Sequence, residues 1–340
     1  MRRMLSLDIL KYFACFLVIC IHMDLPESFE CVIRPLLTTA VPVFFMITGY
    51  FYDQTLSVGK AKKQILKIAC LALVANAVHL GYCVFKHVLN GEPLLRLGAE
   101  IAESAALVNF IIFNQPVWRT SLWFINALLI VLICVYPIRK SETLRKLYPL
   151  IPVLLLCNLL LGTYSFSLPI GEHLPLCYSR NFLFCGLPYF LMGNFIFSYR
   201  QNLSRCLGKW QYTALFFLAC CAELWLLIYT KKLHYEDHLV GTFPLAVSLF
   251  CFFLEKEDFF GGNAWTKIAE FGRKHSFVIY ITHSIIIEIL YKTVAIVSKR
   301  LPFVSNAFEF AGPFVVLALS TAFASLFEYL TDKVKSPRTA

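Results

Sequence analysis

The sequence predicts an all-α fold, a polytopic transmembrane helix bundle of about ten spans. Of its 340 residues, 59% are hydrophobic, and the mean hydropathy of +0.68 is far above that of an ordinary soluble domain. Apolar stretches long enough to cross a bilayer, roughly 17–25 residues each, recur along the whole chain. Such a bundle leaves no room for a soluble domain, so we expect residues 1–340 to form a single integral-membrane domain.

The expected spans follow these apolar stretches in order. We place them at 8–24, 35–52, 65–86, 120–137, 148–165, 180–199, 210–230, 239–254, 275–297 and 307–330. The second contains Pro42 and Gly49, and the eighth is short and contains Pro244. Helix-breaking residues are tolerated in membranes where neighbouring helices satisfy the freed backbone groups. The first span lacks a small-x-small cleavage site, so we expect a permanent helix and not a cleaved signal.

Positive charge predicts the orientation of the chain. Of the 31 lysines and arginines, twenty fall in segments that face the cytoplasm if the N-terminus is inside, nine fall on the outer side and two lie within spans. This bias predicts that both termini lie in the cytoplasm. We expect a multi-pass protein of the inner (plasma) membrane, surrounded by membrane lipids. The net charge of +10 is therefore a topology signal. Because the cations are dispersed over short loops, we expect no nucleic-acid partner.

The 13 cysteines predict neither a disulfide framework nor a metal site. Ten of them fall within the expected spans, where they act as small apolar residues. The sequence contains no C-x-x-C pair and no His/Cys spacing typical of metal ligands, so we expect no metal.

The first span carries two ionisable residues on one face. Lys11 and His22 are eleven positions apart, which in an α-helix is three turns plus roughly 20°, or about 16 Å along the axis. They share a stripe with Asp8, Cys15 and Val18. Ionisable residues inside a membrane are costly and mark functional candidates, and an imidazole is well suited as a general base near neutral pH. The alternative is that Lys11 snorkels to the interface and His22 hydrogen-bonds within a packed bundle.

Asp24 follows His22 by two residues and is a candidate catalytic partner. Two such helical positions are about 200° apart, so the side chains can meet only if the helix frays, which Pro26 favours. An Asp–His pair would fix the imidazole tautomer and raise its basicity. A solvated helix end is an equally good explanation of Asp24.

Other polar residues form candidate binding groups outside the first span. Lys63 and Lys67 lie four apart in K-A-K-K-Q-I-L-K, so they share a helix face that can hold phosphates or simply set topology. Arg119 precedes the segment S-L-W-F-I-N, and Arg180 precedes the sixth span. Each is a candidate for contacting an acceptor or for anchoring a helix end. Trp123 fits either a substrate platform or an interfacial aromatic belt.

The ninth span also has a polar face. At helical spacing this face contains Ser276, Tyr280, His283, Ile287 and Tyr291. His283 lies well inside the span, so we expect it to be buried. Two interpretations remain, a structural histidine between helices and a residue of the active site.

In order along the chain, these motifs resemble the acyltransferase 3 family of bacterial membrane acyltransferases, which decorate cell-surface glycans. Lys11 and His22 keep the spacing of the family's Arg-x10-His motif with Lys for Arg, and S-L-D-I-L-K-Y-F-A resembles its D-x-L-R-x-x-A opening. P-V-F-F-M-I-T-G-Y-F resembles F-F-x-x-S-G-F. Lys63 and Lys67 stand at the arginines of R-x3-R, and the segment around Trp123 matches W-F-L. Two further segments resemble the sixth and ninth spans of the family, L-P-Y-F-L-M-G and F-G-R-K-H-S-F-V-I-Y-I-T-H-S respectively.

The resemblance implies transfer of an acyl group, acetyl by default, from cytoplasmic acyl-CoA to a hydroxyl of an envelope glycan or glycolipid. It implies that acetyl-CoA is held by Lys11, Lys63 and Lys67, and that His22 is a general base or a covalent acyl carrier, with Asp24 beside it. The candidates for acceptor binding are Arg119, Trp123, Arg180 and His283.

Two other classes of function are compatible with the sequence. A transporter or sensing module, linked for example to amino-acid supply, could use buried histidines to relay protons. The absence of an inverted repeat and of a matched pair of broken spans argues against transport. A structural partner in envelope synthesis would leave His22 replaceable.

Overall fold

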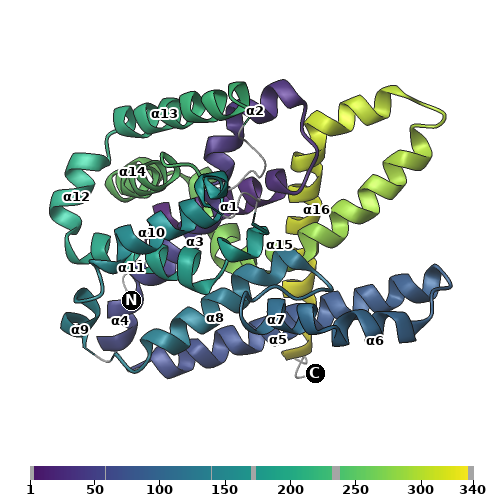
Figure 1. The fold of residues 1–340 in the computed structure, drawn as a ribbon, viewed down its shortest axis with the longest axis horizontal. Coiled ribbons are helices and arrows are strands. Elements are labelled where there is room, and N and C mark those ends of the chain that lie inside the picture. The colour runs from purple at the N-terminus through teal and green to yellow at the C-terminus, as the bar shows by residue number, and fades with distance from the viewer. Residues whose placement is uncertain (1–3, 58, 139, 170–173, 232–237, 336–340) are drawn as a thin grey trace. The chain divides into compact units, whose positions relative to one another are not determined.

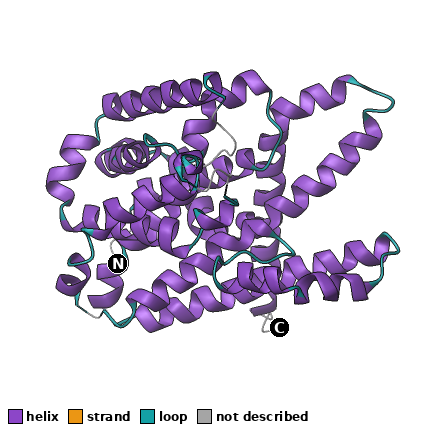
Figure 2. Cartoon of the chain, in the orientation of Figure 1, coloured by secondary structure: helices purple, strands orange, loops and turns teal. Residues whose placement is uncertain are grey.

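The computed structural model describes residues 4–57, 59–138, 140–169, 174–231 and 238–335. Within these ranges all regular structure is helical and no strand occurs (Figure 2). Five helices are long and apolar enough to cross a membrane: Glu27–Ser57, Ala61–Leu89, Trp210–Tyr229, Asn263–Val297 and Phe303–Lys333. Four shorter apolar helices cover Thr120–Val135, Leu150–Leu161, Phe182–Ser198 and Thr242–Glu255. The all-α membrane bundle is thus confirmed, while the count of ten crossings stays a prediction.

The chain divides into two compact units. Unit 1 contains residues 42–203 and 222–243, and unit 2 contains residues 2–41, 204–221 and 244–340. Four helices continue from one unit into the other: α3 (Ala40–Tyr50), α12 (Arg200–Leu207), α13 (Trp210–Tyr229) and α14 (Thr242–Glu255).

Unit 2 is built around three long helices. Its elements are α1 (Leu5–Ile21), α2 (Glu27–Leu37), η5 (Glu257–Phe260), α15 (Asn263–Val297) and α16 (Phe303–Lys335). α15 packs along both α1 and α16 (Figure 1). The approach of α1 to α15 is close, because a Cβ atom on Gly272 would lie 1.9 Å from the carbonyl oxygen of Asp8. The Glu257 carboxylate accepts hydrogen bonds from the N–H groups of Leu5 (2.7 Å) and Ser6 (3.1 Å), which satisfies donors that the first turn of α1 leaves unpaired.

Unit 1 contains the remaining elements. They are α4 (Tyr52–Ser57), α5 (Ala61–Leu89), α6 (Leu94–Ala102), α7 (Ser104–Ile111), η1 (Thr120–Leu122), α8 (Trp123–Val135), α9 (Ser141–Arg145), α10 (Leu150–Leu161), η2 (Ser165–Ser167), η3 (Leu176–Tyr178), the π-helical turn η4 (Phe182–Gly186) and α11 (Leu187–Ser198). α3 and α11 touch through glycines, since a Cβ on Gly49 would lie 1.9 Å from the carbonyl oxygen of Phe190, and one on Gly193 would lie 2.0 Å from that of Met46. Small residues commonly permit such close packing of membrane helices.

Every predicted span overlaps a helix, but several boundaries differ. α1 covers Leu5–Ile21, so the predicted span 8–24 begins and ends three residues too late. α15 begins at Asn263, well before the predicted start at 275. Hydropathy detects only the apolar part of a helix, and α15 continues through the polar segment F-G-R-K-H.

Candidate functional site

Two histidines meet at the C-terminal end of α1. His22 is the C-cap residue of that helix, and its ring centroid lies 5.4 Å from that of His283 in α15, with the ring planes inclined by 33°. His22 is exposed, whereas His283 is only 1% exposed. The His283 Nδ1 atom lies 3.2 Å from the carbonyl oxygen of Ile279. Because a carbonyl can only accept, this contact favours a proton on Nδ1 and leaves Nε2 as the acceptor nitrogen of the neutral ring.

The segment after α1 is tied to the same helix. The backbone N–H of Asp24 donates to the Tyr291 hydroxyl, with 2.6 Å between nitrogen and oxygen, and the Tyr291 ring packs edge-on against Phe308 of α16. Since α1 ends at Ile21, Asp24 is not held at a helical angle from His22. The role of Asp24 beside that histidine stays a prediction.

The predicted stripe of the first span faces α15. Asp8 lies against Gly272, the Cys15 thiol donates to the carbonyl oxygen of Ser276 at 3.7 Å, and His22 meets His283. Residue numbers rise together along both helices, so α1 and α15 run parallel. The expected polar face of α15 therefore meets α1 through the backbone of Ser276 and the side chain of His283.

Lys11 lies at the other end of this stripe. Its Nζ atom is 2.9 Å from the Asp8 Oδ1 atom, and the two side chains are 24% and 8% exposed. The lysine charge is thus balanced within α1 itself, and a ligand phosphate near Lys11 would meet a partly shielded cation.

The other predicted site residues belong to unit 1. Lys63 and Lys67 are both exposed near the start of α5. Arg119 is the residue before η1, and Arg180 is half-buried in the turn before η4. Trp123 begins α8 but is only 9% exposed and packs against the ring of Phe45 at 6.3 Å between centroids. The predicted residues therefore fall into two sets, with His22, Asp24, Lys11 and His283 in unit 2.

A polar network in unit 1 was not predicted from the sequence. His238 is 7% exposed, and its Nδ1 atom lies 2.9 Å from the Oδ1 atom of Asn158 in α10. Asn158 could have been identified from the sequence, because it is the one carboxamide in the predicted span 148–165. His238 could not, because it lies in a connecting segment without periodicity.

A second polar cluster, in unit 2, was also missed. The Nε2 atom of buried His275 lies 2.9 Å from Glu328 Oε2, and Lys274 Nζ lies 2.9 Å from the other oxygen of the same carboxylate. These contacts join α15 to α16. Among the described residues there is no group of three or more His, Cys, Asp or Glu side chains arranged to hold a metal ion.

Comparison with known proteins gives one positive result. A family model described as an acyltransferase domain matches residues 4–329, nearly the whole chain and parts of both units. No curated protein and no solved structure gives a significant match.

Proposed function

The chain belongs to the acyltransferase 3 family, and we propose that it transfers an acetyl group from cytoplasmic acetyl-CoA to a hydroxyl of an envelope carbohydrate or glycolipid. The family match supports a membrane acyltransferase in general. The donor, the acetyl group and the acceptor are part of the proposal, as is the location in the inner (plasma) membrane with both termini in the cytoplasm.

The observation that carries the proposal is the contact between His22 and His283. As a general base, His22 would take the proton of the acceptor hydroxyl while the hydroxyl oxygen attacks the thioester carbonyl. The C–S bond then breaks, and the CoA sulfur leaves and takes up a proton. As an acyl carrier, a His22 nitrogen would attack the carbonyl first and release CoA, and the acceptor hydroxyl would then attack the acyl-imidazole.

His283 has a supporting role in either route. Its imidazole is buried against His22, and a neutral ring with Nδ1 bonded to a carbonyl presents an acceptor nitrogen. Such a neighbour can orient the His22 ring and stabilise its protonated form, as the third member of a catalytic triad does.

The lysines support binding of the donor. Lys63 and Lys67 are exposed in the first two turns of α5, on one helix face. The N-terminus of a helix attracts anions through its unpaired N–H groups and its dipole, so lysines there suit the phosphates of CoA. Lys11, already paired with Asp8, would contribute less to this binding.

The arginines of unit 1 support binding of the acceptor. Arg119 and Arg180 are half-buried beside turns, where their guanidinium groups can bind sugar hydroxyls or an anionic group. Trp123 packs against Phe45, so in this proposal it holds the Arg119 segment in place and is not a platform for a sugar.

Acetyl transfer by the purified protein tests the role of His22. We expect His22→Ala and His22→Gln to lower transfer by roughly 10²–10⁴-fold, because neither side chain can take a proton at neutral pH. The measurement is CoA release and acetylated product with the protein in nanodiscs. As a control, His87→Gln changes a histidine at the end of α5 that contacts Cys83 of the same helix and Glu92 just after it, and it should keep activity. If His22→Gln acetylates near the wild-type rate, the catalytic assignment is wrong.

A further inference from the structure

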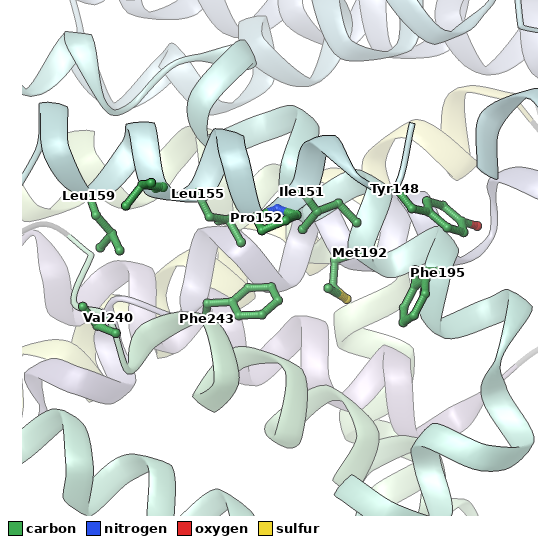
Figure 3. A pocket seen from close by; sticks show the side chains of 10 residues that line it. Tyr148, Ile151, Pro152, Leu155, Leu159, Met192, Phe195, Val240 and Phe243 are labelled. Atoms are coloured by element: carbon green, nitrogen blue, oxygen red, sulfur yellow. The ribbon is translucent and has the colours of Figure 1, made fainter. Parts of the chain in front are cut away.

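An apolar groove lies in unit 1 between α10, α11 and the start of α14 (Figure 3). Its volume is about 500 Å³, which is within the range of small-molecule sites. The residues that define it are Ile151, Leu155 and Leu159 of α10, Met192 and Phe195 of α11, and Phe243 of α14. None of its lining residues was a candidate of the site described above.

The lining of the groove suits a hydrocarbon chain. It extends from Tyr148, two residues before α10, to Leu159 within α10, and the part from Ile151 to Leu159 alone covers about 12 Å of helix. Tyr148 is the one lining residue with a polar side chain, and its hydroxyl donates to the Oδ1 atom of Asn194 at 2.8 Å. A polar molecule such as CoA would find almost no hydrogen-bonding group along this length.

One end of the groove adjoins the polar network of His238. Asn158, which precedes the lining residue Leu159, donates its Nδ2 proton to the carbonyl oxygen of Ser179 at 2.9 Å. This bond turns the Asn158 oxygen toward His238 Nδ1, at 2.9 Å. An amide oxygen cannot donate, so the imidazole proton lies on Nδ1 and Nε2 is the acceptor nitrogen. The ring of Tyr189 lies against both His238 of the polar network and Phe243 of the groove.

Two sets of contacts hold this end of the groove, one from Tyr189 and one from the turn at Val240 and Gly241. The Tyr189 ring lies 5.5 Å from the His238 ring and 6.2 Å from that of Phe243, between centroids. The carboxylate of Glu223 accepts from the N–H groups of Val240 (2.7 Å) and Gly241 (3.0 Å). Val240 lines the groove, so this carboxylate fixes the backbone at its polar end.

We propose that the groove binds the hydrocarbon chain of a lipid-linked carbohydrate, which is the acceptor of the acyl group, with the sugar at the His238 end. The identity of the head group rests on the proposed function. An apolar groove with a buried imidazole and carboxamide close to the lining residues at one end matches an amphiphile with neutral hydroxyl groups, since both kinds of side chain hydrogen-bond hydroxyls directionally. Arg180 follows Ser179, whose carbonyl oxygen accepts the hydrogen bond from Asn158.

Photolabelling tests the groove independently of catalysis. The probe is a long-chain alkyl glucoside with a diazirine in its chain, added to the full-length protein in phosphatidylcholine nanodiscs. We expect label on α10 and on the turn before α14, and loss of label with an excess of the unmodified glucoside. Leu156→Trp, which fills the groove, should reduce labelling roughly tenfold by displacing part of the chain.

A neighbouring residue of α10 provides the matched control. Leu156 lines the groove and is 56% exposed, whereas Val153 is 55% exposed and does not line it. Val153→Trp should leave labelling unchanged. Equal loss in both variants would overturn the proposal, and so would equal competition by phosphatidylglycerol, because the groove would then hold ordinary membrane lipid.

Transfer assays separate this proposal from the proposed function. The wild type should have a lower KM for the long-chain glucoside than for methyl glucoside. Leu156→Trp should raise the KM for the long-chain glucoside to that for methyl glucoside, whereas Val153→Trp should keep the difference. Specific labelling without transfer to any acceptor would contradict the proposed function and support the groove. Transfer without chain preference and without labelling would overturn the proposed binding of a hydrocarbon chain in the groove and leave the proposed function intact.

Discussion

At the residue scale, Lys63 and Lys67 allow the proposed binding of acetyl-CoA to be tested. We expect the double change to Gln to raise the apparent KM for acetyl-CoA roughly tenfold, because charged hydrogen bonds to the phosphates are lost. The rate at saturating donor should change little, since these phosphates are remote from the bond that breaks. Steady-state kinetics at varied acetyl-CoA concentration measure both quantities.

The control for this prediction removes equal charge from the same region. Lys60 and Lys62 are exposed at the start of α5, and their double change to Gln should leave the donor KM near that of the wild type. If both double variants behave alike, the lysines set only topology.

At the residue scale, helical spacing predicted which side chains share a face but not what each face meets. The stripe of Lys11 and His22 and the polar face of His283 were both predictable from periodicity, and so is an ion pair three residues apart such as Asp8–Lys11. The meeting of His22 with His283 was not, because it depends on the register between two helices far apart in sequence. The same limit applies to the pair Asn158–His238.

At the scale of elements, the packing of α1 on α15 depends on one glycine. A Cβ on Gly272 would lie 1.9 Å from the Asp8 carbonyl oxygen, and backbone cannot move aside as a side chain can. We expect Gly272→Ala to destabilise the protein by about 1–3 kcal/mol or more and to lower transfer by separating His22 from His283. Thermal loss of the monodisperse peak in size-exclusion chromatography measures the first effect.

Gly81 is the matched control for this change. It also lies within a long helix, α5, but a Cβ there meets no atom within 4 Å. Gly81→Ala should leave stability unchanged or raise it by up to about 1 kcal/mol, because alanine favours helix. A Gly272→Ala protein as stable as Gly81→Ala would show that α1 does not pack on α15 as described.

The helices themselves were predictable where the length of their apolar part approaches the thickness of a bilayer. The predicted span 65–86 lies within α5 (Ala61–Leu89), and 210–230 matches α13 (Trp210–Tyr229) closely. The helices α6 and α7 were missed because each is shorter than a span. The π-helical turn η4 was missed because it depends on Asn181, whose side chain accepts from two backbone N–H groups, a local detail that hydropathy does not contain.

At the scale of the whole molecule, the parallel packing of α1 and α15 limits the topology. Two membrane helices that run parallel must have an odd number of membrane crossings between them along the sequence. The ten predicted spans place seven crossings between α1 and α15. With this parity, the charge bias predicts that both helices start in the cytoplasm and that the turn between α15 and α16 lies outside. The proposed access of the donor from the cytoplasmic side and of the acceptor from the outer side depends on this predicted orientation.

Cysteine labelling in intact cells tests the orientation. Lys299 is exposed in the turn between α15 and α16, and Cys206 is an exposed native cysteine of α12, predicted to be cytoplasmic. A membrane-impermeant maleimide should modify Lys299→Cys from outside but reach Cys206 only after permeabilisation, with Lys299→Ser showing the background. The reverse pattern would invert the bundle, so that Lys63 and Lys67 would face away from cytoplasmic acetyl-CoA. The donor assignment would then fail even if His22 proved catalytic.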